Sequence, residues 1–313
     1  MSFDLAALQR AVAQHGRVAR VVIAAVAGSS PREVGAAMLV WEGGQSGTIG
    51  GGALEYRAAA EALIRPGLSK HALGPDLGQC CGGSVTLLTE HFDCDGVAAL
   101  GGQPVIARGP GLRPLAVQRL LDRARARGDV PRPQLLQNWM IEPLTTRDQP
   151  LWIWGAGHVG RALVDVLSPL PDLSITWVDT APERFPEAPP ENVRILPTAD
   201  PARAVAIAPR EARHLILTYS HEIDLSLCHA LLGHGFGFAG LIGSDTKWAR
   251  FRTRLRSLGH SDAEIARICC PIGRKSLGKH PHAIAVGVAA QILSLETDRI
   301  GATWQTHSSA SGA

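Results

Sequence analysis

The sequence predicts an α/β protein in which a smaller N-terminal α+β domain precedes a C-terminal Rossmann-type domain with a doubly wound parallel sheet. From residue 151 onward, short apolar runs alternate with helical patterns, as in successive βαβ units. The first of these runs leads into a Gly-x-Gly-x-x-Gly turn at Gly155, Gly157 and Gly160. The earlier part of the chain carries glycine- and cysteine-rich loops instead. A chain of 313 residues is long enough for two domains of ordinary size.

Composition narrows the class of protein. Hydrophobic residues make up 45% and charged residues 19% of the chain, which is typical of a globular protein. The formal net charge is only +3, which does not indicate the dense basic face of a protein that binds nucleic acid. The apolar run 21–27 follows an amphipathic stretch and precedes a Gly-Ser-Ser-Pro turn, which favours a buried strand over a secretory signal. We therefore expect a cytoplasmic protein that binds neither nucleic acid nor membrane.

The six cysteines favour the same compartment. Four of them form the vicinal pairs Cys80-Cys81 and Cys269-Cys270, and the chain contains no Cys-x-x-Cys. Their spacing matches neither a disulfide framework nor a zinc site. Reduced thiols in a reducing compartment are the expectation.

The N-terminal domain is expected to span residues 1–108. Its predicted elements are a helix over 2–16, strands over 18–26 and 37–41, a helix over 53–64 and a strand over 84–88. Residues 115–127 are arginine-rich, and Pro131, Pro133, Pro143 and Pro150 follow, so we interpret residues 109–149 as a solvated interdomain linker.

The Rossmann-type domain is expected to span residues 150–298. Strands are predicted over 151–154, 174–178, 193–196, 214–218 and 238–242, and helices to about 167 and over 224–232, 246–258 and 281–296. Residues 299–313 are expected to form a disordered tail.

The glycine turn has the context that a dinucleotide-binding site requires. Gly155 permits the tight turn, Gly157 lets a phosphate approach the backbone, and Gly160 lets the helix pack on the strand. The helix N-terminus then presents free N–H groups to an anion. Asp179 ends the next strand, where a carboxylate suits the ribose diol of NAD rather than the 2′-phosphate of NADP. Alternatively, the glycines serve packing alone.

Three loops of the N-terminal domain, at 28–35, 47–52 and 79–83, expose backbone N–H groups next to glycine. Ser30 and Arg32 add donors for an anion. The loop 47–52 resembles a phosphate cradle but lacks the Gly-Lys-Ser/Thr ending, which excludes a P-loop ATPase. A thiolate at Cys80 or Cys81 is a candidate nucleophile, sulfur carrier or soft metal ligand. The alternative is a pair of small apolar residues at the start of a strand.

Eight motifs occur in order and together resemble the XdhC/CoxI family, the accessory proteins of xanthine dehydrogenase and related molybdenum hydroxylases. They occupy residues 28–32, 50–55, 81–83, 154–163, 178–180, 219–224, 240–247 and 270–273. The resemblance implies a chaperone, expected to be a homodimer and not an enzyme. Such a chaperone holds the molybdenum cofactor, as Mo-molybdopterin, while a cysteine desulfurase supplies its sulfido ligand, and then delivers it to apo-xanthine dehydrogenase.

The resemblance also implies which residues bind the cofactor. Cys81 is the first choice for the thiol that contacts the molybdenum, with Cys80 beside it. Gln79, Ser30 and Arg32 are further candidates. The glycine turn would face the phosphate of the pterin, with Asp179 at the end of the next strand. Residues 274–282 depart from the family pattern, because His282 replaces an acidic residue before the last helix.

Other polar groups leave a rival function open, an NAD-dependent oxidoreductase that uses the glycine turn. Tyr219, His221 and Asp224 follow a predicted strand at its carboxyl end and are candidate acid/base groups. The alternative is that they start the next helix. Lys247, Arg250 and Arg254 share a helix face by spacing, which we interpret as solvated rather than as a docking surface.

Overall fold

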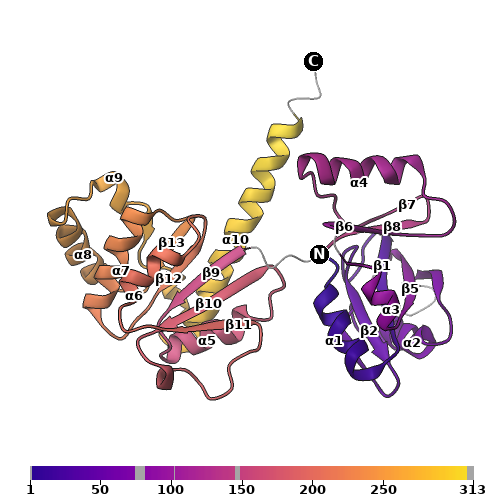
Figure 1. Ribbon diagram of the computed structural model, residues 1–313, viewed down its shortest axis with the longest axis horizontal. Coiled ribbons are helices and arrows are strands. Elements are labelled where there is room, and N and C mark those ends of the chain that lie inside the picture. Colours follow the sequence, from indigo (N-terminus) through magenta and orange to yellow (C-terminus); the bar gives the residue numbers. More distant parts are fainter. Residues whose placement is uncertain (1, 75–81, 102, 145–148, 309–313) are drawn as a thin grey trace. The chain divides into compact units, whose positions relative to one another are not determined.

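The computed structural model describes residues 2–74, 82–101, 103–144 and 149–308, with side chains as far as residue 295. The chain divides into two compact units, Met1–Thr146 and Arg147–Ala313, here called unit 1 and unit 2 (Figure 1).

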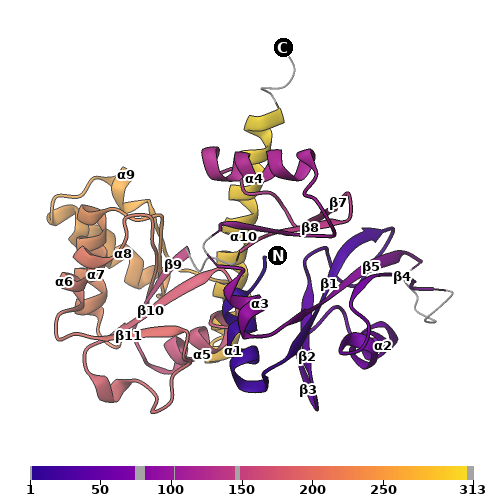
Figure 2. The ribbon, with the colours of Figure 1, turned by 45° about the vertical axis from the view of Figure 1, so that its right-hand side comes forward.

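Unit 1 is built around a five-stranded antiparallel sheet with the strand order β3-β2-β1-β5-β4 (Figure 2). Its elements are α1 Leu5–His15, β1 Val18–Ala27, β2 Ala37–Trp41, β3 Gly44–Gly47, α2 Gly52–Ala62, β4 Gly67–Ala72, β5 Ser84–Phe92 and α3 Cys94–Ala98. Side chains of β1 contribute to three buried clusters. Val21 and Ile23 pack with Leu54 of α2, whereas Val18 packs with Leu8 of α1. The prediction of a buried strand over 18–26 is confirmed.

Residues 109–149 do not form the predicted linker, because most of them fold into unit 1. They contribute α4 Leu115–Arg127, β7 Gln134–Leu136 and β8 Trp139–Pro143. Together with β6 Val105–Arg108, the two strands form a three-stranded sheet, β6-β8-β7, which α4 covers. Val117, Leu121 and Ala124 form a buried stripe beneath the arginines of α4. The prediction was wrong because the buried stripe of α4 is narrow and the strands β7 and β8 are short, so neither gives a strong pattern in the sequence.

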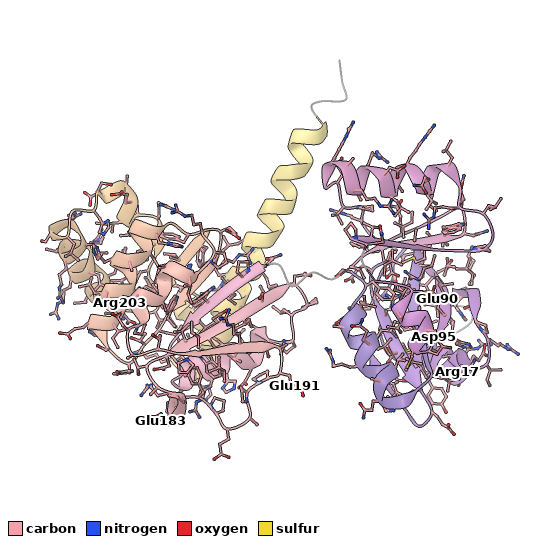
Figure 3. The ribbon with its side chains drawn as sticks, in the orientation of Figure 1. Arg17, Glu90, Asp95, Glu183, Glu191 and Arg203 are labelled. Atoms are coloured by element: carbon pink, nitrogen blue, oxygen red, sulfur yellow. The ribbon has the colours of Figure 1, made fainter. Side chains whose placement is uncertain are left out.

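A buried ion network joins the two sheets of unit 1. Glu142 on β8 is fully buried and accepts hydrogen bonds from Arg20 Nη1 and Nη2 on β1, at 3.0 and 2.7 Å. Arg108 on β6 donates from Nη2 to the same carboxylate, at 2.5 Å, and from Nε to Glu90 on β5, which Figure 3 labels. Both guanidinium groups also lie over the ring of Phe3. Residues 105–143 are thereby an integral part of unit 1.

Unit 2 has a six-stranded parallel sheet with the order β11-β10-β9-β12-β13-β14. The strands are β9 Gln149–Trp154, β10 Leu173–Asp179, β11 Val193–Pro197, β12 Arg213–Ile216, β13 Phe238–Leu241 and β14 Ile268–Cys269. The helices are α5 His158–Leu167, α6 Pro201–Ala204, α7 His221–His234, α8 Asp245–Ser257, α9 Asp262–Ile265 and α10 Pro281–Ser308, and short 3-10 turns occupy Pro182–Arg184, Val205–Ile207 and Lys275–Leu277. The prediction of a doubly wound parallel sheet is confirmed.

Both faces of this sheet are covered, as Figure 1 shows for unit 2. Leu151 and Ile153 of β9 pack against α5 and α10, whereas Trp152 and Trp154 pack on the other face with α7 and α8. The strand order reverses between β9 and β12, and ligands of such sheets bind outside the carboxyl ends of the strands at this point. The glycine turn follows β9 and therefore lies at this point.

The last helix extends beyond its predicted end. α10 continues to Ser308, whereas the sequence predicts a helix end near 296 and a disordered tail from 299. Residues 297–308 contain no proline, and a proline there would end the helix. Among the residues that the structure describes, no helix is both long and apolar enough to cross a bilayer.

Candidate functional site

The three glycines of the turn after β9 occupy three different environments. Gly155 has a φ of +123°, and a Cβ added there would lie 2.5 Å from the carbonyl oxygen of Leu217. A Cβ at Gly160 would collide with the carbonyl oxygen of Gly155. A Cβ added at Gly157 would meet no atom within 4 Å other than those of its chain neighbours. Gly155 and Gly160 are thus required by packing, whereas Gly157 leaves room for a group that approaches the backbone from outside.

The same turn starts α5 and leaves its N-terminus free. Gly157 is the N-cap residue and provides no side-chain hydrogen bond to the first turn. The first N–H groups of a helix have no partner within the helix, and they carry the positive end of its dipole. His158, the first residue of α5, is exposed. The geometry is that of an anion site open to solvent.

Asp179 lies under the glycine turn rather than in the open. Its side chain is only 2% exposed, and its carboxylate accepts hydrogen bonds from the backbone N–H of Ala156, at 2.5 Å, and of Thr180, at 2.6 Å. Arg184 Nε lies 2.6 Å from the same carboxylate, and its guanidinium covers the ring of Tyr219. Asp179 therefore stabilises the turn by accepting a hydrogen bond from Ala156. A ribose diol would have to compete with Arg184 for its carboxylate.

A buried polar network centred on Asp224 of α7 joins the loop after β12 to α8. Asp224 is 1% exposed and accepts hydrogen bonds from the N–H of Thr218, at 3.0 Å, and from its hydroxyl, at 2.7 Å. Lys247 of α8 donates from Nζ to Asp224, at 2.6 Å, and to the carbonyl oxygen of Ile242, at 3.0 Å. This network fixes the loops after β12 and β13 at the carboxyl edge of the sheet.

This network changes the interpretation of two predicted groups. Lys247 does not share a solvated face with Arg250 and Arg254, because its side chain is 11% exposed and paired with Asp224. His221 is the first residue of α7 and Asp224 lies in its first turn, but Ser220 caps the helix, and the Asp224 side chain binds Thr218 and Lys247. Tyr219 is 63% exposed at the same edge. The pairing across 23 residues leaves no signal in sequence periodicity, which is why it was missed.

In unit 1, the glycine loops gather at one end of the five-stranded sheet. A Cβ at Gly50 would lie 2.7 Å from Pro31 Cγ, so the loop 47–52 packs on the loop 28–35. A Cβ at Gly28 would lie 3.1 Å from Gly83 Cα, so the residues just before β5 pack there too. The topology causes this, because β1 ends opposite the start of β5.

Of the predicted side chains in these loops, only two lie in the described part of the chain. Ser30 donates from Oγ to the carbonyl oxygen of Arg32, at 2.9 Å, which shapes the turn. The Arg32 side chain is 30% exposed, with Nε 3.7 Å from Glu33. Gln79, Cys80 and Cys81 lie outside the described residues, so their roles stay predictions.

The loop 47–52 is organised by Glu55 of α2, a motif residue to which the sequence alone assigned no role. Its Oε2 accepts hydrogen bonds from the hydroxyl of Thr48, at 2.5 Å, and from the N–H groups of Ile49, at 2.9 Å, and Gly51, at 3.0 Å. Burial raises the pKa of Glu55, but these hydrogen bonds outweigh burial and lower the pKa overall. The amides that resembled a phosphate cradle already bind this carboxylate.

The other cysteine pair, Cys269-Cys270, lies in the described part of unit 2. Gln291 Nε2 lies 3.3 Å from Cys269 Sγ, and burial raises the pKa of Cys270 to about 11. Within the described part of the chain, no group of three or more histidine, cysteine or acidic side chains is placed to hold a metal ion.

These features define a class: a two-unit protein with a Rossmann-type unit, whose glycine turn is open to an anion, and an antiparallel unit with clustered glycine loops. The comparisons then identify the family. Residues 151–292 match the model of the XdhC Rossmann domain, and residues 11–65 match that of the XdhC and CoxI family. Together these matches span more than half of the chain. The protein belongs to the XdhC and CoxI family, as its motifs predicted.

Two individual proteins illustrate the similarity. YqeB of Escherichia coli (strain K12) is 28% identical over 159 residues, a match that covers 50% of this chain and 29% of YqeB. The chain thus spans less than a third of that relative's length. The crystal structure of a xanthine dehydrogenase from Bacillus halodurans overlaps with a TM-score of 0.70 at 19% identity. The overlap covers 95% of this chain and 97% of that one, and it supports the fold.

Proposed function

We propose that the protein acts in the maturation of xanthine dehydrogenase or a related molybdenum hydroxylase. In this proposal it binds Mo-molybdopterin, protects it while a cysteine desulfurase installs the sulfido ligand, and delivers it to the apo-enzyme without catalysing a reaction of its own. Family membership supports the maturation role. The open glycine turn supports the binding of a phosphate-bearing molecule, and it is the observation on which the proposal depends.

The phosphate of the cofactor fits the turn at Gly157. The N-terminus of α5 has free N–H groups, no capping side chain and open space in front of the N-cap residue. A phosphate accepts hydrogen bonds from such groups and is stabilised by the helix dipole. Asp179 holds the turn in shape through the N–H of Ala156, so the site is formed before a ligand arrives.

The loop thiol supplies the second part of the proposal. We assign Cys81 as the molybdenum-contacting residue, with Cys80, Gln79, Ser30 and Arg32 around it. The support is local: Gly83, two residues after Cys81, packs on Gly28 beside the Ser30 turn. A thiolate is a soft ligand suited to a molybdenum–sulfur centre. We further propose that the protein is a homodimer and that it acts in the cytoplasm.

The test compares two alanine variants in unit 2. Gly157→Ala adds a methyl group in the space that a phosphate would occupy, and the φ of −73° at Gly157 suits alanine. Gly233→Ala in α7 is the matched control, because its added methyl group also meets open space. We expect Gly157→Ala to fold normally and to bind molybdopterin at least about tenfold more weakly, measured by anaerobic fluorescence titration. Equal affinities for both variants would refute a role of the turn.

The thiol has a separate test. Cys81→Ala and Cys80→Ala are each loaded with the cofactor and mixed with apo-xanthine dehydrogenase, and the recovered dehydrogenase activity is measured. Loss of transfer in Cys81→Ala alone supports the assignment. Normal transfer in Cys81→Ala overturns it.

The rival function, an NAD-dependent oxidoreductase, rests on the same turn. The burial of Asp179 and its contact with Arg184 weigh against recognition of a ribose diol. Titration with NADH distinguishes the two functions. Micromolar NADH binding that Gly157→Ala abolishes, together with reduction of a carbonyl substrate, would favour the oxidoreductase.

A further inference from the structure

A cavity lies at the carboxyl edge of the unit 2 sheet. Its volume is about 460 Å³, and it opens beyond the ends of β13 and β14. None of its lining residues belongs to the turn 155–160. Sites for small molecules typically have volumes of roughly 300–1,000 Å³. The cavity therefore has room for a ligand of its own.

The walls of the cavity are mainly apolar. Ile242 follows β13, Pro271 and Ile272 follow β14, and Ile284 comes from α10. Three of the other lining residues are glycines, so the backbone is accessible there. Such a surface suits the flat or apolar body of an organic molecule rather than a bare ion.

The rim of the cavity carries an excess of positive charge. Arg274, Lys275 and Lys279 line it together with a single carboxylate, that of Asp245. Lys275 Nζ lies 2.5 Å from Asp245 Oδ2, so this carboxylate is already paired. Within the described part of the chain, no hydrogen bond or ion pair involves the side chain of Arg274 or of Lys279. Two cations beside an apolar cavity therefore remain available for an anionic group.

We propose that this cavity is a binding site for an organic phosphate. The ring or apolar body of the ligand fills the space between Ile272 and Ile284, and its phosphate lies against Arg274 and Lys279. A guanidinium matches the geometry of two phosphate oxygens, and an ammonium adds a point charge. The site is separate from the glycine turn and does not depend on the proposed function.

The experiment uses AMP as the probe and the full chain labelled at the isoleucine δ1 methyl groups. Three isoleucines line the cavity, and Ile153 of β9 lies buried in the strand that leads into the glycine turn. We expect AMP to shift the methyl resonances of Ile242, Ile272 and Ile284 in a saturable way. Adenosine and inorganic phosphate should each bind at least about tenfold more weakly, since each lacks one half of the recognition.

Three variants assign the binding. Arg274→Gln combined with Lys279→Gln should raise the Kd for AMP at the cavity methyl groups by about tenfold or more. Arg252→Gln, an exposed cation of α8, is the control and should leave the Kd unchanged. Gly157→Ala should also leave it unchanged, which separates this site from the glycine turn.

The remaining outcomes overturn the proposal. These are the absence of saturable shifts at the cavity methyl groups, shifts confined to Ile153, inorganic phosphate binding as tightly as AMP, and an AMP affinity that the double variant leaves intact. A failure of Gly157→Ala to weaken molybdopterin binding bears on the glycine turn alone.

Discussion

His214 makes the stability of unit 2 depend on pH. It lies on β12 with no exposed surface, and its Nδ1 accepts a hydrogen bond from Trp154 Nε1, at 3.1 Å. Burial, and to a smaller extent the charge of His234, lowers its pKa from 6.5 to about 3. The folded protein therefore keeps this imidazole neutral at pH values where the unfolded chain protonates it.

The sign and size of the effect follow from linkage. Between pH 6.5 and pH 3 the unfolded state binds one proton that the folded state does not, so stability falls as the pH falls. Each pKa unit corresponds to about 1.4 kcal/mol, and at pH 5 the loss amounts to about 2 kcal/mol relative to pH 7. The full loss, reached near pH 3, is about 5 kcal/mol.

The assay is urea unfolding followed by tryptophan fluorescence, to which the buried Trp152, Trp154 and Trp177 of unit 2 contribute. His214→Asn keeps an acceptor near Trp154 but does not titrate, so its stability should change about 2 kcal/mol less between pH 7 and pH 5. His229→Asn, an exposed histidine of α7, is the control and should behave as the wild type. The same pH dependence in the wild type and in His214→Asn would refute the reasoning.

Two further predictions concern unit 1. Glu142→Gln leaves Arg20 and Arg108 buried without their shared carboxylate and should cost about 3–5 kcal/mol in urea unfolding. Glu61→Gln, at a carboxylate whose side chain is 45% exposed, should cost less than about 0.5 kcal/mol. Similar costs for both would show that the network contributes little. Glu55→Ala should speed amide hydrogen exchange at Ile49 and Gly51 by about tenfold, measured by NMR, because both N–H groups lose their acceptor; unchanged exchange would mean that the loop holds its shape without Glu55.

The features that the sequence predicted well are local in the chain. The glycine turn was recognised because a strand, three glycines and a helix follow one another between Gln149 and Leu167. The parallel sheet was predicted because alternation of strands and helices is itself a local pattern. Even the separate tasks of Gly155 and Gly160 follow from their positions in the turn, and the structure confirms the close packing at both.

The features that were missed depend on contacts between distant residues. Glu142 stands 122 residues from Arg20, so the sequence of 109–149 alone did not show that it belongs to unit 1. Lys247 was assigned to a solvated face by helix periodicity, but a buried Asp224 turns it inward. Glu55 was seen only as part of a motif. The folded loop shows that its carboxylate accepts hydrogen bonds from the backbone N–H groups of Ile49 and Gly51.

The two ends of unit 1 lie together. The N–H of Phe3 donates to the carbonyl oxygen of Pro143, at 2.7 Å, and Phe3 forms a parallel bridge with Leu144. A chain that returns to its starting point in this way tolerates circular permutation and insertion into a host protein. Joining residues 3 and 144 with a short peptide and reopening the chain at the exposed turn of Gly43 would preserve every strand of both sheets. We therefore expect a permuted unit 1 to keep the ion network of Arg20, Arg108 and Glu142, because these residues lie on strands that neither cut interrupts.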